Sequence, residues 1–326
     1  SSVSGGMSNT ASGVASSVNG GWGNEASNAQ SSVSGGETNE AAGLNSWVGG
    51  GMGNRAADWA TSVSGGSDNE AAGSHSSVTG GRNNKATGDF AAVVGGGSDN
   101  PLYGNEAFGN YSAVLGGIFN IAGDPDRIDH SIGEKSTVSG GDTNRATGTY
   151  SSVTGGKTNT ASGDVSAVAG GRYNEASGGF SFVGGGGSEN SNEGNIAFAH
   201  YSAILGGLNN RTGDTTYCYW YHEVELYLCM EGGDPTIGVQ GTVSGGKSNT
   251  ASGDYASVSG GYANAASGDW SSVSGGNTNA ASGEHSSITG GKTNTASGDW
   301  SVVSGGYLRG VSGPYDWQAG DLFEDE

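Results

Sequence analysis

A fixed period of 15 residues is the feature that most constrains how this chain can fold. Val or Ile recurs every 15 residues at positions 3–93, 138–183 and 243–303, and two displaced copies, Val114 and Ile204, bring the number of repeats to 18. A Gly-Gly pair begins two residues after this Val or Ile in all 18 repeats. Such periodicity predicts a solenoid, in which each repeat forms one coil and buries its apolar side chains only against neighbouring coils.

The composition of the repeat indicates which kind of solenoid it forms. Gly makes up 67 of the 326 residues, about three times the usual ~7%, and this density of Gly and Ser excludes helical repeats. The consensus SSVSGGxxNxASGxx contains two extended pieces, SSVSG and NxASG, separated by Gly-rich turns. We therefore predict an all-β fold: a parallel β-solenoid (β-roll) of about 18 coils with 15-residue repeats and two short strands per coil.

Two columns of residues are expected to support these coils. The invariant Gly pair indicates a backbone at positive φ or a close approach between neighbouring coils. An Asn lies six residues after the Val or Ile in 15 of the 18 repeats, and these side chains are expected to form a structural ladder. The predicted ladder includes Asn9, Asn24, Asn39, Asn54, Asn69, Asn84, Asn144, Asn159, Asn174, Asn249, Asn264, Asn279 and Asn294.

The pattern predicts a single solenoid domain over residues 1–326, with coils at 1–120, 136–210 and 241–312. Loop or hairpin insertions interrupt it at about 97–106, 121–135, 187–196 and 211–240, and residues 313–326 are expected to form a C-terminal cap or tail. The insertions at 97–106 and 187–196 lie 90 residues apart, and each precedes a longer one, which indicates an older duplication. Loops that leave a rigid scaffold at fixed positions are common binding sites.

The charge balance limits the partners of this chain. Its 32 acidic and 12 basic residues give a net charge of −20. A chain this acidic repels nucleic acid and anionic membrane surfaces, and its apolar residues come in runs too short to span a bilayer. We therefore expect no nucleic-acid partner and no membrane insertion.

No pattern in the sequence predicts catalysis. The five His residues are scattered, and Ser is so frequent that a Ser near a His carries no information. The acidic loop GDPDRIDH at 123–130 offers Asp124, Asp126 and Asp129 as candidate Ca²⁺ ligands, but it lacks the Gly and bidentate Glu of an EF-hand, and a solvated loop explains the same residues. We expect a protein without enzymatic activity, cofactor or built metal site.

Half-units such as NTASGDY at 249–255 and SVSGG at 257–261 recur through nearly the whole chain outside the insertions. With one extra Gly, they resemble the AxG and SVxG halves of the head repeats of trimeric autotransporter adhesins of the YadA-like type. The resemblance implies a left-handed parallel β-roll, three chains side by side, and a surface-exposed adhesive or receptor-binding fibre. Similar repeats also fit phage tail fibres.

The excursion at 211–240 contains both cysteines and the one dense aromatic cluster of the sequence. β-forming residues alternate on both sides of its centre, which predicts a hairpin. Together with the extracellular setting that the adhesin resemblance implies, the symmetric placement of Cys218 and Cys229 favours a disulfide across this hairpin, and reduced thiols are the alternative. The aromatic residues either contact a receptor or glycan, or cover the solenoid flank or a subunit interface; they are Tyr217, Tyr219, Trp220, Tyr221 and Tyr227.

A second aromatic pattern lies three residues before the Val or Ile of the later coils. Rings are too large for a core of Val and Ala, so we expect this column at a corner or on the outside. Packing between chains is the favoured role, because aromatic residues are enriched at interfaces, and stacking on glycan rings is the alternative. The predicted interface column contains Phe90, Tyr111, Tyr150, Phe180, Tyr201, Tyr255, Trp270 and Trp300, with His75 and His285 in the same register.

These observations favour a non-enzymatic structural or adhesive protein that is extracellular or located at the cell surface. Its coils are expected to form a rigid rod that associates with other copies, as a lateral trimer or as an end-to-end filament. An ice-binding solenoid, or a phage or virion fibre that recognises a surface glycan, are the alternatives. The expected partners are therefore further copies of the chain and a host surface or glycan.

Overall fold

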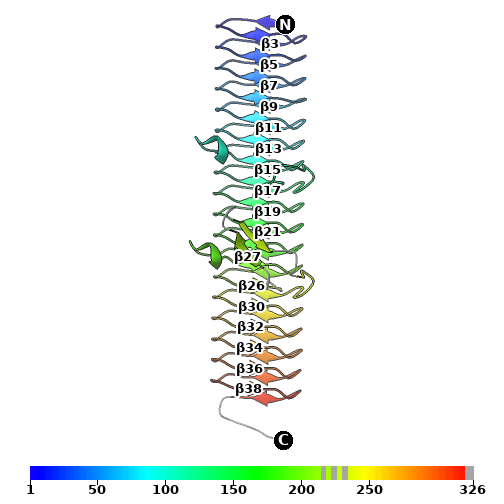
Figure 1. Cartoon of the computed structure of the whole chain (residues 1–326), viewed down its shortest axis with the longest axis vertical. Helices are drawn as coiled ribbons and strands as arrows, with labels where there is room; N and C mark the ends of the chain where they lie inside the picture. Colours follow the sequence, from blue (N-terminus) through cyan, green and yellow to red (C-terminus); the bar gives the residue numbers. More distant parts are fainter. Residues whose placement is uncertain (214–217, 222–225, 230–233, 320–326) are drawn as a thin grey trace. The chain divides into compact units, whose positions relative to one another are not determined.

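The computed structural model describes residues 1–213, 218–221, 226–229 and 234–319, and it confirms the all-β parallel solenoid with two short strands per coil. The chain divides into two compact units, Ser1–Thr158 and Asn159–Glu326. Each unit contains two parallel ladders of two-residue strands, named here the Val ladder and the Ala ladder after the residue that most strands bury (Figure 1). The single domain over 1–326 stays a prediction.

In the first unit, each strand pairs with the strand of the same ladder one coil further along the chain. Its Val ladder consists of β1 (Ser2–Val3), β3 (Ser17–Val18), β5 (Ser32–Val33), β7 (Trp47–Val48), β9 (Ser62–Val63), β11 (Ser77–Val78), β13 (Ala92–Val93), β15 (Ala113–Val114), β17 (Thr137–Val138) and β19 (Ser152–Val153). Its Ala ladder consists of β2 (Thr10–Ala11), β4 (Glu25–Ala26), β6 (Glu40–Ala41), β8 (Arg55–Ala56), β10 (Glu70–Ala71), β12 (Lys85–Ala86), β14 (Glu106–Ala107), β16 (Ile121–Ala122) and β18 (Arg145–Ala146).

The second unit repeats this arrangement. Its Val ladder consists of β21 (Ala167–Val168), β23 (Phe182–Val183), β25 (Ala203–Ile204), β29 (Thr242–Val243), β31 (Ser257–Val258), β33 (Ser272–Val273), β35 (Ser287–Ile288), β37 (Val302–Val303) and β39 (Trp317–Gln318). Its Ala ladder consists of β20 (Thr160–Ala161), β22 (Glu175–Ala176), β24 (Ile196–Ala197), β26 (Arg211–Thr212), β30 (Thr250–Ala251), β32 (Ala265–Ala266), β34 (Ala280–Ala281), β36 (Thr295–Ala296) and β38 (Gly310–Val311).

The core of each unit is one column of Val or Ile from one ladder and one column of mostly Ala from the other. The ladders keep this register, since Val63 pairs with Val78 and Ala71 pairs with Ala86, and these side chains are at most 1% exposed. A buried Val contributes about 1.5–3 kcal/mol, whereas ordering the backbone costs about 1–2 kcal/mol per residue. A coil with so small a core therefore depends on hydrogen bonds to its neighbours.

The Gly pair forms one corner of each coil, named here the Gly corner. The second Gly of every pair has φ between +77° and +102°. A Cβ on Gly66 would lie 2.2 Å from the carbonyl oxygen of Gly81 in the next coil, whereas a Cβ on Gly65 would meet nothing within 4 Å. The second Gly of the pair therefore shows both expected features, a positive φ and a close approach to the next coil.

The opposite corner, named here the ring corner, also needs a left-handed residue but seldom uses Gly. The residue three positions before the buried Val has φ of about 50–65° in coil after coil, as in Asn45 (58°), Phe90 (57°) and Trp270 (55°). Non-Gly residues are uncommon in this region. The ring corner therefore accepts many side-chain types, and it presents them in a regular row.

The Asn side chains form a hydrogen-bonded column inside each unit, next to the Gly corner. Asn69 Nδ2 donates to the carbonyl oxygens of Gly65 at 3.0 Å and Gly81 at 2.9 Å, and its Oδ1 accepts from the backbone N–H of Asn84 at 3.0 Å. Each Asn thereby bonds to its own coil and to its neighbours. The column also includes Asn120 and Asn210, which lie six residues after Val114 and Ile204, and two residues outside the predicted spacing, Asn105 and Asn195.

The shorter insertions leave the coils next to the Gly corner. Each contains a 3₁₀ helix, η1 (Pro101–Tyr103) or η2 (Ser191–Glu193), and the Asn that precedes the helix accepts a hydrogen bond from its second residue. An ion pair ties each insertion to its coil, Arg82 with Asp99 and Arg172 with Glu189. In Figure 1, η1 and the longer excursion of the first unit lie at opposite edges. The equivalent ion pairs support the predicted duplication.

The Val ladder extends further than the sequence pattern indicates. Strand β39 pairs with β37 and places Gln318 opposite Val303, inside the segment predicted as a cap or tail. Neither a Val nor a Gly pair marks this coil in the sequence. Residues 320–326 of the predicted tail lie outside the part of the chain that the structure describes.

Candidate functional site

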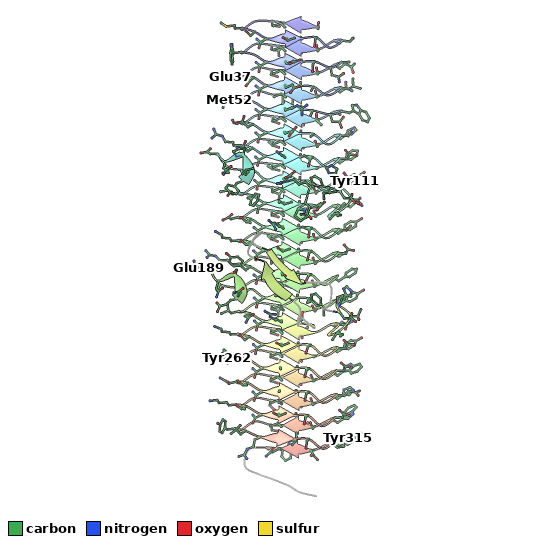
Figure 2. The ribbon with its side chains drawn as sticks, viewed as in Figure 1. Glu37, Met52, Tyr111, Glu189, Tyr262 and Tyr315 are labelled. Carbon is green, nitrogen blue, oxygen red and sulfur yellow. The ribbon has the colours of Figure 1, made fainter. Side chains whose placement is uncertain are left out.

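The ring column is the most distinctive exposed feature of both units. Its eight predicted aromatic residues occupy the left-handed position of the ring corner, and each is 47–55% exposed. Figure 2 shows Tyr111 of the first unit at the edge opposite Glu37 and Met52, which follow Gly pairs. The column therefore lies on the outside of a corner.

In the first unit, three rings of the column stack on one another. The ring centroids of His75 and Phe90 are 4.8 Å apart, those of Phe90 and Tyr111 are 4.9 Å apart, and the planes differ by 6° and 1°. Trp59, one position before the column, meets His75 edge-on at 4.4 Å. The stacking distances match the ~4.8 Å between hydrogen-bonded strands, so the stacking follows from the register of the coils.

Lys135 continues this column between two Tyr rings. Its Nζ lies 5.7 Å from the ring centroid of Tyr111 and 4.7 Å from that of Tyr150. It also donates to the Tyr150 hydroxyl at 2.9 Å and pairs with the Glu134 carboxylate at 2.9 Å. The hydrogen bond to Tyr150 and the contacts with Glu134 raise the pKa of the Lys135 ammonium above its usual value. The column thus combines rings, an ammonium and a carboxylate.

The described column of the second unit contains two stacks. Phe180 and Tyr201 form the first, with centroids 4.9 Å apart. In the second, successive centroids are 5.3, 5.1, 3.9 and 6.3 Å apart. Its members are Tyr255, Trp270, His285, Trp300 and Tyr315.

Two members of the column lie outside the predicted set. Lys135 stands three residues before Val138, but the insertion at 121–135 hides its register. Tyr315 stands three residues before Gln318, which replaces the marker Val. Counting backwards from Val138 would have found Lys135, whereas no sequence signal marks the last coil.

The stacking determines which part of each ring a partner can reach. Rings in a stack are nearly parallel and cover the faces of their neighbours, so the edges of the rings face solvent. A glycan ring that stacks on an aromatic face needs that face free. The geometry therefore disfavours the predicted alternative of glycan stacking along the column, except at the ends of a stack. The predicted interface role of the column stays a prediction.

The excursion at 211–240 contains the expected hairpin. Strands β27 (Cys218–Tyr221) and β28 (Leu226–Cys229) pair antiparallel, with Cys218 opposite Cys229. The side chains of these strands lie outside the described part of the structure, as does Tyr217. The receptor or flank contacts of Tyr217, Tyr219, Trp220, Tyr221 and Tyr227 and the disulfide therefore stay predictions.

We expect Cys218 and Cys229 to be cross-linked in protein purified without reductant. Residues directly opposite each other in an antiparallel pair have a Cα separation that a disulfide can bridge. Mass spectrometry of non-reduced digests should recover the linked peptide pair, and Cys218→Ser should leave one titratable thiol. Two thiols that react with an alkylating reagent in the folded, unreduced protein would contradict the prediction.

The carboxylates of the acidic loop accept hydrogen bonds from other groups of the same loop and so stabilise its conformation. Asp124 accepts the backbone N–H groups of Asp126, Ile128 and Asp129 at 2.9–3.0 Å. Burial raises the pKa of Asp124, but these hydrogen bonds outweigh it and hold the pKa below its usual value. Asp129 accepts from the N–H and hydroxyl of Ser131. Among residues 1–213, 218–221, 226–229 and 234–319, no three His, Cys, Asp or Glu side chains form a group suited to a metal ion.

Glu175 on β22 is a buried acid at a position where most coils carry a polar side chain that is at least partly exposed. Its side chain is 6% exposed, and the equivalent Glu25 on β4 is exposed. Burial raises the pKa of Glu175 to about 7, although the nearby Ser177 hydroxyl and the charge of Arg211 act in the opposite direction. The carboxyl group therefore stays protonated in the folded chain up to nearly neutral pH.

Glu175 should make the second unit less stable as the pH rises from about 4.5 to about 7. The unfolded chain ionises Glu175 first, so the free energy of unfolding falls over this window by roughly 3 kcal/mol. Urea unfolding of Glu175→Gln should show this pH dependence reduced and the stability at pH 8 increased. Glu25→Gln is the matched control, and an identical pH profile for both variants and the unaltered protein would contradict the prediction.

The in-register coils define a parallel β-solenoid repeat protein. Residues 136–148 match the family model of the ubiquitous surface protein adhesin repeat. The matched segment is nearly one coil, with β17, the Gly pair, Asn144 and β18. This match and the parallel solenoid agree with the resemblance to YadA-like head repeats of adhesins. Among curated proteins, none matches the chain. In the described part of the chain, no helix has the length and apolar character needed to cross a membrane.

Proposed function

We propose that this protein is a non-enzymatic adhesive protein of the cell surface or extracellular space, whose solenoid units pack side by side with those of other copies. The match of residues 136–148 to an adhesin repeat supports the adhesive class. The observation that carries the self-association is the outer face of the Val ladder.

This face is lined mostly by small side chains. The residues on either side of each buried Val, such as Ser62 and Ser64, are at least partly exposed. Four larger apolar residues stand at the same positions in coils next to the short insertions, Val94 and Leu115 in the first unit and Phe182 and Leu205 in the second, and they are 37–59% exposed. Small side chains allow two sheets to approach closely, and exposed apolar groups favour burial in an interface.

Light scattering on purified protein tests this self-association. We expect trimers or longer assemblies at micromolar concentration, and we expect Leu115→Ser/Leu205→Ser to require at least tenfold more protein to assemble. Leu102→Ser is the matched control, because Leu102 lies in η1 and is 73% exposed. Monomers at every concentration would overturn the self-association, and electron microscopy would separate lateral trimers from end-to-end filaments.

Adhesion is tested separately with protein-coated beads. Such beads should stay attached to cell layers under flow more often than beads coated with serum albumin. Equal retention of both kinds of bead would overturn the adhesive role.

A further inference from the structure

The last described stack of the second unit has a row of acids beside its rings. Asp254, Asp269, Glu284 and Asp299 each come directly before a ring residue. The N–H groups of Trp270, His285, Trp300 and Tyr315 each donate to the carbonyl oxygen of the acidic residue one coil earlier, as Trp270 does to Asp254 at 2.8 Å. We name these two adjacent rows the acidic ring strip; its rings are Tyr255, Trp270, His285, Trp300 and Tyr315.

The strip contains no basic residue of its own apart from His285. Between residues 241 and 319 the sequence has three Lys or Arg residues, Lys247, Lys292 and Arg309. Lys247 and Lys292 follow Gly pairs at the Gly corner, and Lys292 Nζ lies 5.8 Å from the ring centroid of Tyr307. Arg309 takes the position of the Asn column, where its N–H donates to Asn294 Oδ1. The carboxylates of the strip are therefore not balanced by Lys or Arg at the ring corner.

The first unit shows how the same corner holds a cation. There Lys135 occupies the column itself, its ammonium lies against the rings of Tyr111 and Tyr150, and the preceding residue Glu134 supplies the carboxylate. The strip repeats the order of acid followed by ring in four consecutive coils, with rings in place of the Lys. The strip therefore supplies the carboxylates and the rings of that arrangement, and the cation would come from a partner molecule.

We propose that the acidic ring strip is a docking surface for an extended, Arg- or Lys-rich segment of a partner protein. The methylene stems of such side chains pack against ring edges while their charged ends reach the carboxylates. A second copy of the strip is a poor partner, because its carboxylates would meet like charges. The inference goes beyond the proposed function, since it requires neither self-association nor attachment to a surface.

The test measures binding of a fluorescent octa-arginine peptide to the full chain by fluorescence anisotropy at 0.15 M salt, about physiological ionic strength. Asp269→Asn/Asp299→Asn removes two charges but keeps an oxygen that can accept from the N–H groups of Asp254 and Glu284. Asn110 already makes this hydrogen bond with Asp89 at 2.9 Å in the first unit. Trp270→Asn/Trp300→Asn removes two rings at a position where Asn45 already has φ of 58°.

We expect each double variant to weaken peptide binding about five- to thirtyfold, because each removes two exposed contacts of roughly 0.5–1 kcal/mol. Glu25→Gln/Glu37→Gln is the matched control, because it changes the net charge by the same amount at exposed positions of the first unit. Its affinity should stay within twofold of the unaltered protein. Equal weakening by this control, unchanged binding by both strip variants, or no binding by the unaltered chain would each overturn the proposal. Circular dichroism verifies that the variants are folded.

Discussion

Gly66→Ala should prevent the first unit from folding properly, whereas Gly65→Ala should leave its stability almost unchanged. Gly66 has φ of +91°, and an added Cβ would lie 2.2 Å from Gly81 O and 2.5 Å from Asn69 Nδ2. Two backbone segments would have to separate, which would break hydrogen bonds between coils. We expect a loss of more than about 4 kcal/mol in the free energy of unfolding.

Gly65 is a close control for this prediction, because it is the other half of the same Gly pair. A Cβ at Gly65 would meet nothing within 4 Å, and its φ lies outside the left-handed region. Gly65→Ala should therefore change the free energy of unfolding by less than about 1 kcal/mol. Urea titrations followed by circular dichroism measure both variants. Comparable stability for the two variants would show that close approach of the coils does not require Gly at position 66.

Asn279→Ala should cause the second large loss of stability. Asn279 is 1% exposed, and its Nδ2 donates to the carbonyl oxygens of Gly275 at 2.9 Å and Gly291 at 3.1 Å. Its Oδ1 accepts from the N–H of Asn294 at 3.0 Å. Ala would leave the buried N–H of Asn294 and the carbonyl oxygen of Gly275 without this partner, and Gly291 O would keep only its hydrogen bond from the N–H of Asn277. Each group left unsatisfied costs about 1–3 kcal/mol. We expect a loss of roughly 3–5 kcal/mol in the free energy of unfolding.

Asn277 provides the matched control two residues earlier in the same coil. It is partly exposed, and its side chain accepts a hydrogen bond from the Thr278 hydroxyl at 2.7 Å. Asn277→Ala should cost less than about 1 kcal/mol. Thermal unfolding of the two variants side by side gives the comparison. A loss for Asn279→Ala no larger than that for Asn277→Ala would mean that the column does not hold the coils together.

The fold could be predicted from the sequence because the repeat specifies every coil in the same way. A 15-residue period with an invariant Gly pair leaves one register for the strands, so Val63 can pair only with a Val of a neighbouring coil. The Asn column follows from the same spacing. Its members Asn105 and Asn195 lie outside the predicted ladder because insertions separate them from the marker Val by more than six residues.

The candidate site could be predicted only in part. Composition and spacing place the rings at a corner, but they do not show whether a ring face or a ring edge is accessible. That depends on the nearly parallel planes, such as the 1° between Phe90 and Tyr111, which follow from the shared backbone conformation of the corner. The buried state of Glu175 also has no signal in the sequence, since Glu25 and Glu40 occupy the same position in other coils and are not buried.

The ring corner keeps one left-handed backbone conformation with many different side chains, so the residues on the surface can differ while the core residues stay the same. Ala60, Asn45, Phe90 and Lys135 all adopt almost the same φ, 53–60°, at this position. Side chains there can therefore change without altering the Val, Ala, Gly and Asn columns.

The hydrogen bonds of the Asn column connect only adjacent coils. A recombination event that adds or removes a whole 15-residue repeat therefore leaves every remaining junction intact. The number of repeats and the pattern on the ring corner can thus evolve independently. The solenoid is therefore a scaffold whose length and ring-corner side chains can both change while its core stays the same.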